Sequence, residues 1–310
     1  AKPWGTYLRW MLGTLAAVVL LVGAFNVVMD PLNVFGSPRV AGLNAVKPHL
    51  DHHRELTRWR IASKHCASAV ILGNSRTEIG LDPEHPAFAA LGLSAVNLAV
   101  PGTDATNAYR QLLWLQSIGC MPKVVVLGVE FFDFLGAAPA KGLPTVATAP
   151  PPQTDAAFFA EVVFSITGLG DSLNTLGLQR ARYPATLTDR GFNPLRNYVA
   201  EVSQSGHYTL FRQRALENAK NWGRKPRHIR PAGGESSEDA AAVQGILELA
   251  SAAGSKVHLV IYPYHAQIRL MLLQMGLNDL FGAWKADTVQ AAMRTRKGPQ
   301  ATKANIEVWD

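Results

Sequence analysis

The chain has 310 residues, of which 48% are hydrophobic and 17% charged, with two cysteines and a net charge of +7 at neutral pH. This length can bury a sizeable core, and the ordinary composition excludes collagen-like, disordered and repeat proteins. Lys and Arg are scattered along the chain, and their densest cluster, residues 224–230, has almost no aromatic interleaving. The charge therefore favours a solvated basic face or attraction to an anionic surface, and no nucleic-acid partner is expected.

An uncharged apolar run, WMLGTLAAVVLLVGAFNVVM, covers residues 10–29. About 20 apolar residues at 1.5 Å per residue match a bilayer core of roughly 30 Å, so we predict a membrane-spanning helix. Lys2 and Arg9 precede the run and Asp30 follows it, so the positive-inside rule predicts that residues 1–9 are cytoplasmic and the rest lies outside. A signal peptide with a weak cleavage pattern near residues 22–24 is the alternative, but the run is long for one and we expect a retained anchor.

Residues 30–65 are expected to form a lead-in that is irregular at first and ends as a polar helix over residues 51–65. Apolar runs rich in β-branched residues follow and alternate with helical stretches. Runs that are apolar almost throughout are typical of strands covered on both faces, so this alternation predicts a parallel α/β sheet. The predicted strands are residues 69–72, 95–100, 124–129, 257–262 and 306–309, and the predicted helices include residues 107–117 and 237–253.

The α/β domain is expected over residues 66–310, but more than a hundred residues separate its third and fourth strands. This separation is too long for a plain crossover loop. We predict an insertion over residues 136–236 that is partly helical, with helices near residues 155–167 and 197–222. Such an insertion would shape a cleft or dock a partner.

The two cysteines, Cys66 and Cys120, each lie just before a predicted strand, the first and the third. If these strands are parallel neighbours, both thiols lie at the same end of the sheet. An oxidising compartment would then permit a disulfide, provided that the Cα atoms are less than about 7 Å apart. Two buried free thiols are the alternative.

Three successive predicted strands end in residues suited to a binding or catalytic site. Ser75 follows the first strand, Gly102 follows the second, and Gly128 and Glu130 lie at the end of the third. The carboxyl ends of parallel strands form one edge of a sheet, where loops and helix N-termini present free N–H groups to ligands. A serine there can act as a nucleophile if a base takes its proton and N–H groups bind the oxyanion.

This series of motifs resembles the SGNH (GDSL-like) hydrolase superfamily. GNSR is similar to its serine block, AVPGT to its glycine block, and GVE stands where the superfamily has Gly-x-Asn. The DPLNVF lead-in, GLDP and YPYHA are similar to its membrane-anchored bacterial branch. The resemblance implies a flavodoxin-like sheet, an inner-membrane anchor, a periplasmic domain, and a serine esterase or O-acyltransferase acting on cell-envelope carbohydrate or lipid. Ser75 would be the nucleophile, and the N–H groups of Ser75 and Gly102 the oxyanion donors.

The sequence departs from that superfamily at two places. Glu130 is only an acceptor when ionised, so it cannot supply the hydrogen bond that Asn supplies. The superfamily also has an Asp-x-x-His pair beyond the fifth strand, whereas the given sequence ends at Asp310. A different class of protein therefore stays open, namely an inactive scaffold or accessory subunit of a larger inner-membrane complex.

Several histidines are alternatives for the catalytic base. His265 is the best candidate because YPYHA follows the fourth strand at the same edge, although it can equally cap the next helix. His85 belongs to an Asp-x-x-His in a Pro-flanked turn close to Ser75, and His53 to an Asp51-His52-His53 run that reads as a solvated helix start. His258 lies inside the fourth strand and is expected in the core.

The remaining patterns argue against bound cofactors. No metal-ligand spacing of Cys and His is present, and no dinucleotide-binding or Walker glycine pattern occurs. The aromatic run FFDF, residues 131–134, is interpreted as core. We therefore expect no cofactor and no metal, and membrane lipid as a partner.

Overall fold

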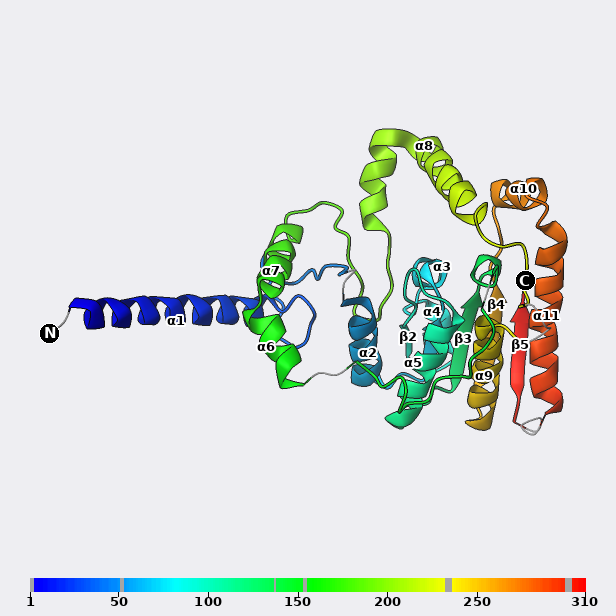
Figure 1. The fold of residues 1–310 in the computed structure, drawn as a ribbon, viewed down its shortest axis with the longest axis horizontal. Coiled ribbons are helices and arrows are strands. Elements are labelled where there is room, and N and C mark those ends of the chain that lie inside the picture. Colours follow the sequence, from blue (N-terminus) through cyan, green and yellow to red (C-terminus); the bar gives the residue numbers. More distant parts are fainter. Residues whose placement is uncertain (1–2, 51–52, 137, 153–154, 232–235, 299–302) are drawn as a thin grey trace. The chain divides into compact units, whose positions relative to one another are not determined.

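The computed structural model of the protein describes residues 3–50, 53–136, 138–152, 155–231, 236–298 and 303–310 (Figure 1). The chain divides into two compact units. The first consists of Ala1–Arg54, Pro152–Leu187 and Leu195–Ala200, and the second of Glu55–Pro151, Thr188–Pro194 and Glu201–Asp310. The segment predicted as an insertion therefore contributes to both units.

The first unit begins with α1 (Pro3–Met29), which contains the predicted membrane-spanning run. Over Trp4–Met29 it is the one helix in the described parts of the chain that is by itself long and apolar enough to cross a membrane. Its side chains are exposed from Trp4 to Leu20 and become buried near its C-terminal end. The predicted apolar helix is thus confirmed as a helix, extended by two turns at its N-terminal end.

The end of α1 is held by a turn centred on Asp30. The Asp30 backbone adopts a positive φ of 43°, and its Oδ1 accepts hydrogen bonds from the N–H groups of Val34 at 2.6 Å and Phe35 at 3.2 Å. Lys47 Nζ donates to the carbonyl oxygens of Met29 and Asp30, each at 2.8 Å. A cation that satisfies the last carbonyls of a helix stabilises its C-terminus, so the lead-in begins as a cap on α1.

Two further helices of the first unit, α6 (Ala156–Phe164) and α7 (Ile166–Leu178), replace the single helix predicted near residues 155–167. They meet at an angle of 58°. Ser165 causes the break, because its extended backbone ends α6 while its Oγ accepts from the N–H of Gly168 at 2.9 Å and so caps α7. A long helix, α8 (Arg196–Trp222), follows, with non-helical backbone at Gly206.

The second unit contains a five-stranded, wholly parallel sheet, which confirms the predicted α/β class. Its order, β2-β1-β3-β4-β5, is the doubly wound order also found in flavodoxin, with the topological switch point between β1 and β3. Ligands bind such sheets at the carboxyl ends of the strands beside this point. The strands are β1 (Ala69–Leu72), β2 (Ala95–Asn97), β3 (Val124–Val129), β4 (Lys256–Ile261) and β5 (Asn305–Trp309).

The helices of the second unit alternate with the strands as predicted, and α5, α9 and α11 pack side by side (Figure 1). Together with the strands they enclose a core of Val, Leu, Ile and Phe side chains in which β1 is completely buried. The aromatic run 131–134 lies in this core, as predicted, with Phe131, Phe132 and Phe134 buried. The helices are α2 (Arg54–His65), α3 (Ser75–Gly80), α4 (Pro86–Ala90), α5 (Ala105–Ser117), α9 (Glu238–Ala252), α10 (Ala266–Gln274) and α11 (Asn278–Lys297), with a 3-10 turn, η2 (Phe131–Asp133).

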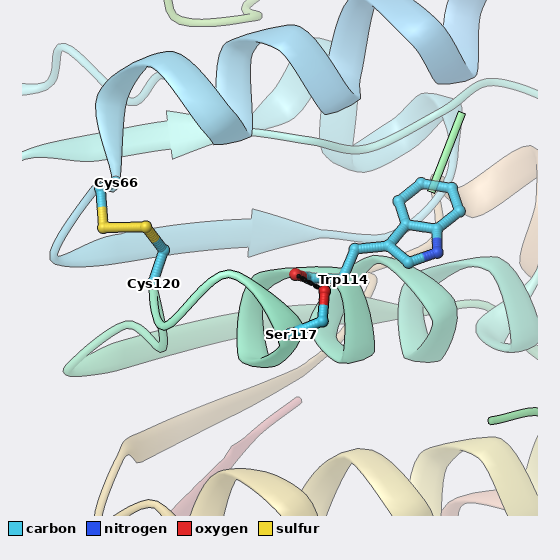
Figure 2. Close-up of a disulfide and its surroundings, with 4 residues drawn as sticks. All are labelled: Cys66, Trp114, Ser117 and Cys120. Atoms are coloured by element: carbon cyan, nitrogen blue, oxygen red, sulfur yellow. Dashed lines mark hydrogen bonds between the residues drawn. A yellow bond between two sulfur atoms is a disulfide. The ribbon is translucent and has the colours of Figure 1, made fainter. Parts of the chain in front are cut away.

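Cys66 and Cys120 form a disulfide (Figure 2), and their Cα atoms lie 5.1 Å apart. Cys66 follows α2, and Cys120 follows α5, whose last turn includes Ser117 and Trp114. β1 and β3 are neighbours in the sheet, so both thiols lie at the end where these two strands begin. The predicted disulfide is therefore confirmed, and the alternative of two free thiols is wrong.

His258 was expected in the core, and this expectation is wrong. Its side chain is about 25% exposed, its Nδ1 lies 3.2 Å from Glu307 Oε2, and it accepts a hydrogen bond from the Trp309 indole at 3.2 Å. Burial and the neighbouring Lys256 lower the pKa of His258. The reason is topological, because β4 pairs on one side with β5, the edge strand, and its side chains on that face are only partly covered.

Candidate functional site

The turn after β1 exposes Ser75 and is held by close packing beneath it. Gly73 has a φ of 145°, and a Cβ there would lie 2.1 Å from Thr77 Oγ1 and 2.9 Å from the Gly128 carbonyl oxygen. Only glycine fits this space and this backbone conformation. Asn74 then caps α3 by accepting from the N–H of Arg76 at 3.1 Å, and Ser75 is the exposed first residue of the helix.

Gly128 has a related packing role one strand away. A Cβ at Gly128 would lie 2.0 Å from the Tyr262 hydroxyl and 2.4 Å from Thr77 Oγ1, and these two hydroxyl groups are hydrogen-bonded to each other. The residue thus lets β3 approach the base of α3 closely. Gly128 was singled out because it lies at a strand end. Its role is packing beneath Ser75, and it does not line the cavity described below.

The second strand contributes Gly102, Thr103 and Asp104 to the same edge. Gly102 has a φ of 77°, and nothing lies within 4 Å of the position of a Cβ there, so its backbone borders open space. Asp104 caps α5, with its Oδ1 accepting from the N–H of Thr106 at 3.1 Å. Gly102 therefore lies on the open side of the turn, and a ligand can approach its backbone there.

The third strand contributes two carboxyl groups, one of which was not predicted. Glu130 follows β3 directly and is buried, and Asp133 is the last residue of the η2 turn. Asn74 Nδ2 donates to both, to Glu130 Oε2 at 2.9 Å and to Asp133 Oδ2 at 3.0 Å. Arg76 Nε donates to Glu130 Oε1 at 2.8 Å, so the Glu130 carboxylate has a counter-ion.

Residues that follow β1, β2 and β3 line one cavity of about 310 Å³. It lies beside the switch point of the sheet, the position at which doubly wound proteins bind ligands. Lys225, which follows α8, closes one side of it and donates from its Nζ to the Phe132 carbonyl oxygen. The lining residues are Asn74, Ser75, Gly102, Thr103, Asp104, Glu130, Asp133 and Lys225.

Asp133 has the electrostatic environment of a proton-transfer group. Burial, and next to it the charge of Glu130, raises the pKa of Asp133 to about 8, against the smaller opposing effects of the Asn74 hydrogen bond and Lys225. Burial and the charge of Asp104 also raise the pKa of Asp239, on α9, to about 7. A carboxyl group with a pKa near neutrality can release and accept protons at physiological pH.

The structure brings together three of the predicted site residues, Ser75, Gly102 and Glu130, but not His265. The His265 imidazole caps α10, with its Nδ1 accepting from the N–H of Gln267 at 3.3 Å, and its ring stacks on Phe211 at 5.6 Å between centroids. It is not among the residues that line the cavity. The capping role that the sequence left open as an alternative is the one observed.

The other histidines also have local partners. His85 caps α4 by accepting from the N–H of Ala87 at 3.2 Å, and His53 lies 3.8 Å from Asp171 in the first unit. Asp51 and His52 lie outside the described residues. Within the described part of the chain, no group of three or more His, Cys, Asp or Glu side chains is arranged to hold a metal ion.

Sequence reasoning missed five of the lining residues, Asn74, Thr103, Asp104, Asp133 and Lys225. One signal was available for Asp133, because a carboxylate inside the otherwise aromatic run FFDF must be satisfied or protonated when the run is buried. No comparable signal existed for Lys225, which is 92 residues further along the chain and joins the cavity only through folding.

Comparison with family models, with curated proteins and with solved structures finds no match to this chain. The resemblance to SGNH hydrolases accordingly rests on the sequence motifs. What the structure adds independently is the α/β class, the strand order and a polar cavity that contains Ser75.

Proposed function

We propose that this protein is a membrane-anchored serine esterase or O-acyltransferase of the SGNH type, located in the bacterial inner membrane with its α/β domain in the periplasm. Its substrates would be acyl esters of cell-envelope carbohydrate or lipid. The observation that carries the proposal is the position of Ser75, exposed beside the switch point in a cavity that also contains Gly102 and a carboxyl group of raised pKa.

In this proposal, Ser75 Oγ forms a bond to the acyl carbon while its proton passes to a base. The carbonyl oxygen becomes an oxyanion near the N–H groups of Ser75 and Gly102, and collapse of this intermediate releases the alcohol, which takes a proton. Water or a second hydroxyl group then removes the acyl group from Ser75. The open space beside Gly102 leaves room for an acyl oxygen to approach its N–H.

We propose Asp133 as the base, in place of the expected His265. Asp133 lines the Ser75 cavity and His265 does not. A carboxylate of ordinary pKa is a weak base at neutral pH, whereas the pKa of about 8 for Asp133 makes its ionised form basic enough to accept a serine proton. Burial is the main cause of this raised pKa, and the charge of Glu130, which is paired with Arg76, adds to it.

The second candidate function is a catalytically inactive scaffold or accessory subunit of a larger inner-membrane complex. It is favoured by the Glu130 side chain, which accepts hydrogen bonds from Asn74 and Arg76 where the SGNH pattern has an Asn donor. A carboxylate at that position repels an oxyanion. The two candidates differ in whether Ser75 reacts as a nucleophile.

Labelling with a fluorophosphonate probe tests this difference on the full chain in detergent or lipid nanodiscs. If the proposal is correct, the wild-type protein is labelled, Ser75→Ala abolishes labelling, and Ser63→Ala, a change at an exposed serine on α2, leaves it unchanged. Absence of labelling in folded wild-type protein would exclude the hydrolase proposal and support the scaffold.

The pH dependence of labelling identifies the base. With Asp133 as base, the labelling rate rises as pH increases through about 8, where the carboxyl group ionises, and Asp133→Asn removes most of the rate. A rate that falls over the same range would mean that protonated Asp133 is needed, as an oxyanion donor. Loss in His265→Ala with an unchanged rate in Asp133→Asn would assign the role to His265.

A further inference from the structure

The bend between α6 and α7 carries an exposed apolar surface. Phe164 is 52% exposed, Ile166 is 89% exposed and Leu173 is 54% exposed. Ile166, Gly170, Leu173 and Gly177 follow each other at intervals of four, three and four residues, so they lie along one face of α7, and all four are exposed. This surface is called the α7 face below.

The α7 face has no charge. From residue 162 to residue 179 the sequence contains one charged residue, Asp171, and it is buried, with an oxygen 3.8 Å from His53. Exposed helix faces in water normally carry charged side chains, and a face without them that presents large apolar groups indicates contact with a partner or with lipid.

The bend packs directly on the last turns of α1, in the same unit. A Cβ at Gly23 would lie 2.8 Å from the Phe164 ring, and Asn26 Nδ2 donates to the Val163 carbonyl oxygen at 2.9 Å. Gly168 lies beside Asn26 as well, since a Cβ there would be in van der Waals contact with Asn26 Nδ2 at 3.4 Å. Figure 1 shows α6 and α7 lying across the C-terminal end of α1, with their junction beside it.

The position of this contact along α1 sets its depth in a membrane. If Arg9 marks the cytoplasmic boundary, the apolar core begins at Trp10, and Gly23 lies about 20 Å further along the helix axis at 1.5 Å per residue. A bilayer core is roughly 30 Å thick, so Gly23 lies within its outer half. Phe164, which contacts Gly23, must then lie at or below the outer boundary of the hydrocarbon region.

We propose that α6 and α7 form an interfacial helix pair that lies in the outer leaflet of the membrane spanned by α1, with Phe164 and the α7 face in contact with lipid. The occupant is lipid because α6 and α7 both pack on α1, whose apolar side chains, such as Leu20 and Leu21, are themselves exposed. Interfacial helices bury an apolar face at the boundary between head groups and acyl chains, as the α7 face would. Arg180 and Arg182, exposed just after α7, would meet the head groups.

Spin-label accessibility tests this proposal on the full chain, reconstituted in nanodiscs of phosphatidylethanolamine and phosphatidylglycerol. Single cysteines are introduced as Ile166→Cys and Leu173→Cys, with Leu20→Cys on α1 as the lipid reference and Val40→Cys, 49% exposed on the lead-in, as the aqueous reference. The native cysteines do not react with the label because they form a disulfide.

The expected result is that labels at residues 166 and 173 relax faster with oxygen than with a water-soluble nickel complex, as the label at residue 20 does. Faster relaxation with nickel, as expected at residue 40, would overturn the proposal. Low accessibility to both reagents would also overturn it, because it would show that protein, such as a second copy of the chain, covers the α7 face.

Discussion

Asp133 belongs to a small hydrogen-bond network in which the side-chain amide of Asn74 donates to the carboxyl groups of both Asp133 and Glu130. Glu130 has the Arg76 counter-ion, whereas Asp133 is half-buried in the wall of the cavity, where desolvation and then the charge of Glu130 raise its pKa to about 8. Such a carboxyl group costs folding free energy when ionised. A protein keeps a group of this kind where function needs it, which is consistent with a role in the cavity.

The raised pKa predicts a pH dependence of stability. Below the unfolded value of 3.8, Asp133 is protonated in both states; as pH rises towards about 8, only the unfolded chain ionises, and the free energy of unfolding falls. This contribution falls by up to about 1.4 kcal/mol for each pH unit in that window. Asp133→Asn should therefore gain stability relative to wild type as pH rises, by up to about 4 kcal/mol between pH 5 and pH 8.

Urea unfolding followed by tryptophan fluorescence, at both pH values and in detergent, measures this difference. Combined with the labelling experiment, this measurement distinguishes a catalytic role of Asp133 from a purely structural one. If Asp133 is catalytic, the Asp133→Asn variant should be more stable than wild type but less reactive. A variant that is less stable than wild type at both pH values would contradict the raised pKa.

Arg58, on α2, is fully buried and holds three parts of the second unit together. It forms an ion pair with Glu78 and donates from Nη1 to the carbonyl oxygens of Asn97 at 3.1 Å and Gly191 at 2.6 Å. Glu78 also accepts from Asn193 Nδ2 at 3.1 Å. The guanidinium thereby ties the segment Thr188–Pro194 to the end of β2.

Removing Arg58 should be strongly destabilising, because it leaves the buried Glu78 carboxylate without its cation. We expect Arg58→Ala to reduce the free energy of unfolding by about 3–5 kcal/mol. Lys64→Ala, at an exposed position on the same helix, should change it by less than about 0.5 kcal/mol. A double variant, Arg58→Met with Glu78→Leu, should recover part of the loss in the same urea titration, and no recovery would show that the backbone hydrogen bonds of Arg58 dominate.

At the scale of elements, the disulfide (Figure 2) links the segments that lead into β1 and β3. It lies at the end of the sheet where these strands begin, whereas the cavity lies where they end. The T-shaped contact of Trp59 on α2 with Trp114 on α5, 5.9 Å between ring centroids, adds a second link between the helices that precede these strands. Both links fix β1 and β3, the strands on either side of the switch point. The geometry at their carboxyl ends depends on that placement.

Replacing both cysteines by serine should lower the free energy of unfolding. The disulfide closes a loop with a sequence separation of 54 residues. The chain-entropy relation gives about 4 kcal/mol for a loop of this length, and we expect a loss of about 2–4 kcal/mol. The urea titration of Cys66→Ser with Cys120→Ser should coincide with that of reduced wild-type protein. An unchanged midpoint in both would contradict a stabilising role.

At the scale of the whole molecule, the two units have different chemistry. The first contains the apolar helix α1 with the α6 and α7 pair, and the second contains the sheet and the cavity. The segment between β3 and β4 contributes to both units. It provides α6 and α7 of the first unit, and Lys225 in the cavity of the second. A unit whose helix α1 is long and apolar enough to cross a membrane, together with a polar cavity on the same chain, is consistent with the proposed enzyme for membrane-bound or envelope substrates.

The class of fold, the apolar helix and three residues of the cavity could all be predicted from the amino-acid sequence. Local patterns were sufficient for these, since continuous apolar runs report strands buried on both faces, and a serine or glycine at a strand end is placed at one edge of any parallel sheet. The same logic placed the cysteines at a common end.

The groups that surround Ser75, in contrast, could not all be predicted, because they depend on contacts between distant segments. Asp133 appears in the sequence as part of an aromatic core segment, and Lys225 lies 92 residues beyond it; both join the cavity through contacts across the fold. His265 was assigned to the site from its strand end, yet its imidazole caps α10, because a free helix N–H lies two residues away. Strand ends set the location of a site, whereas the direction of each side chain and the pKa of a buried group depend on neighbours that are distant in the sequence.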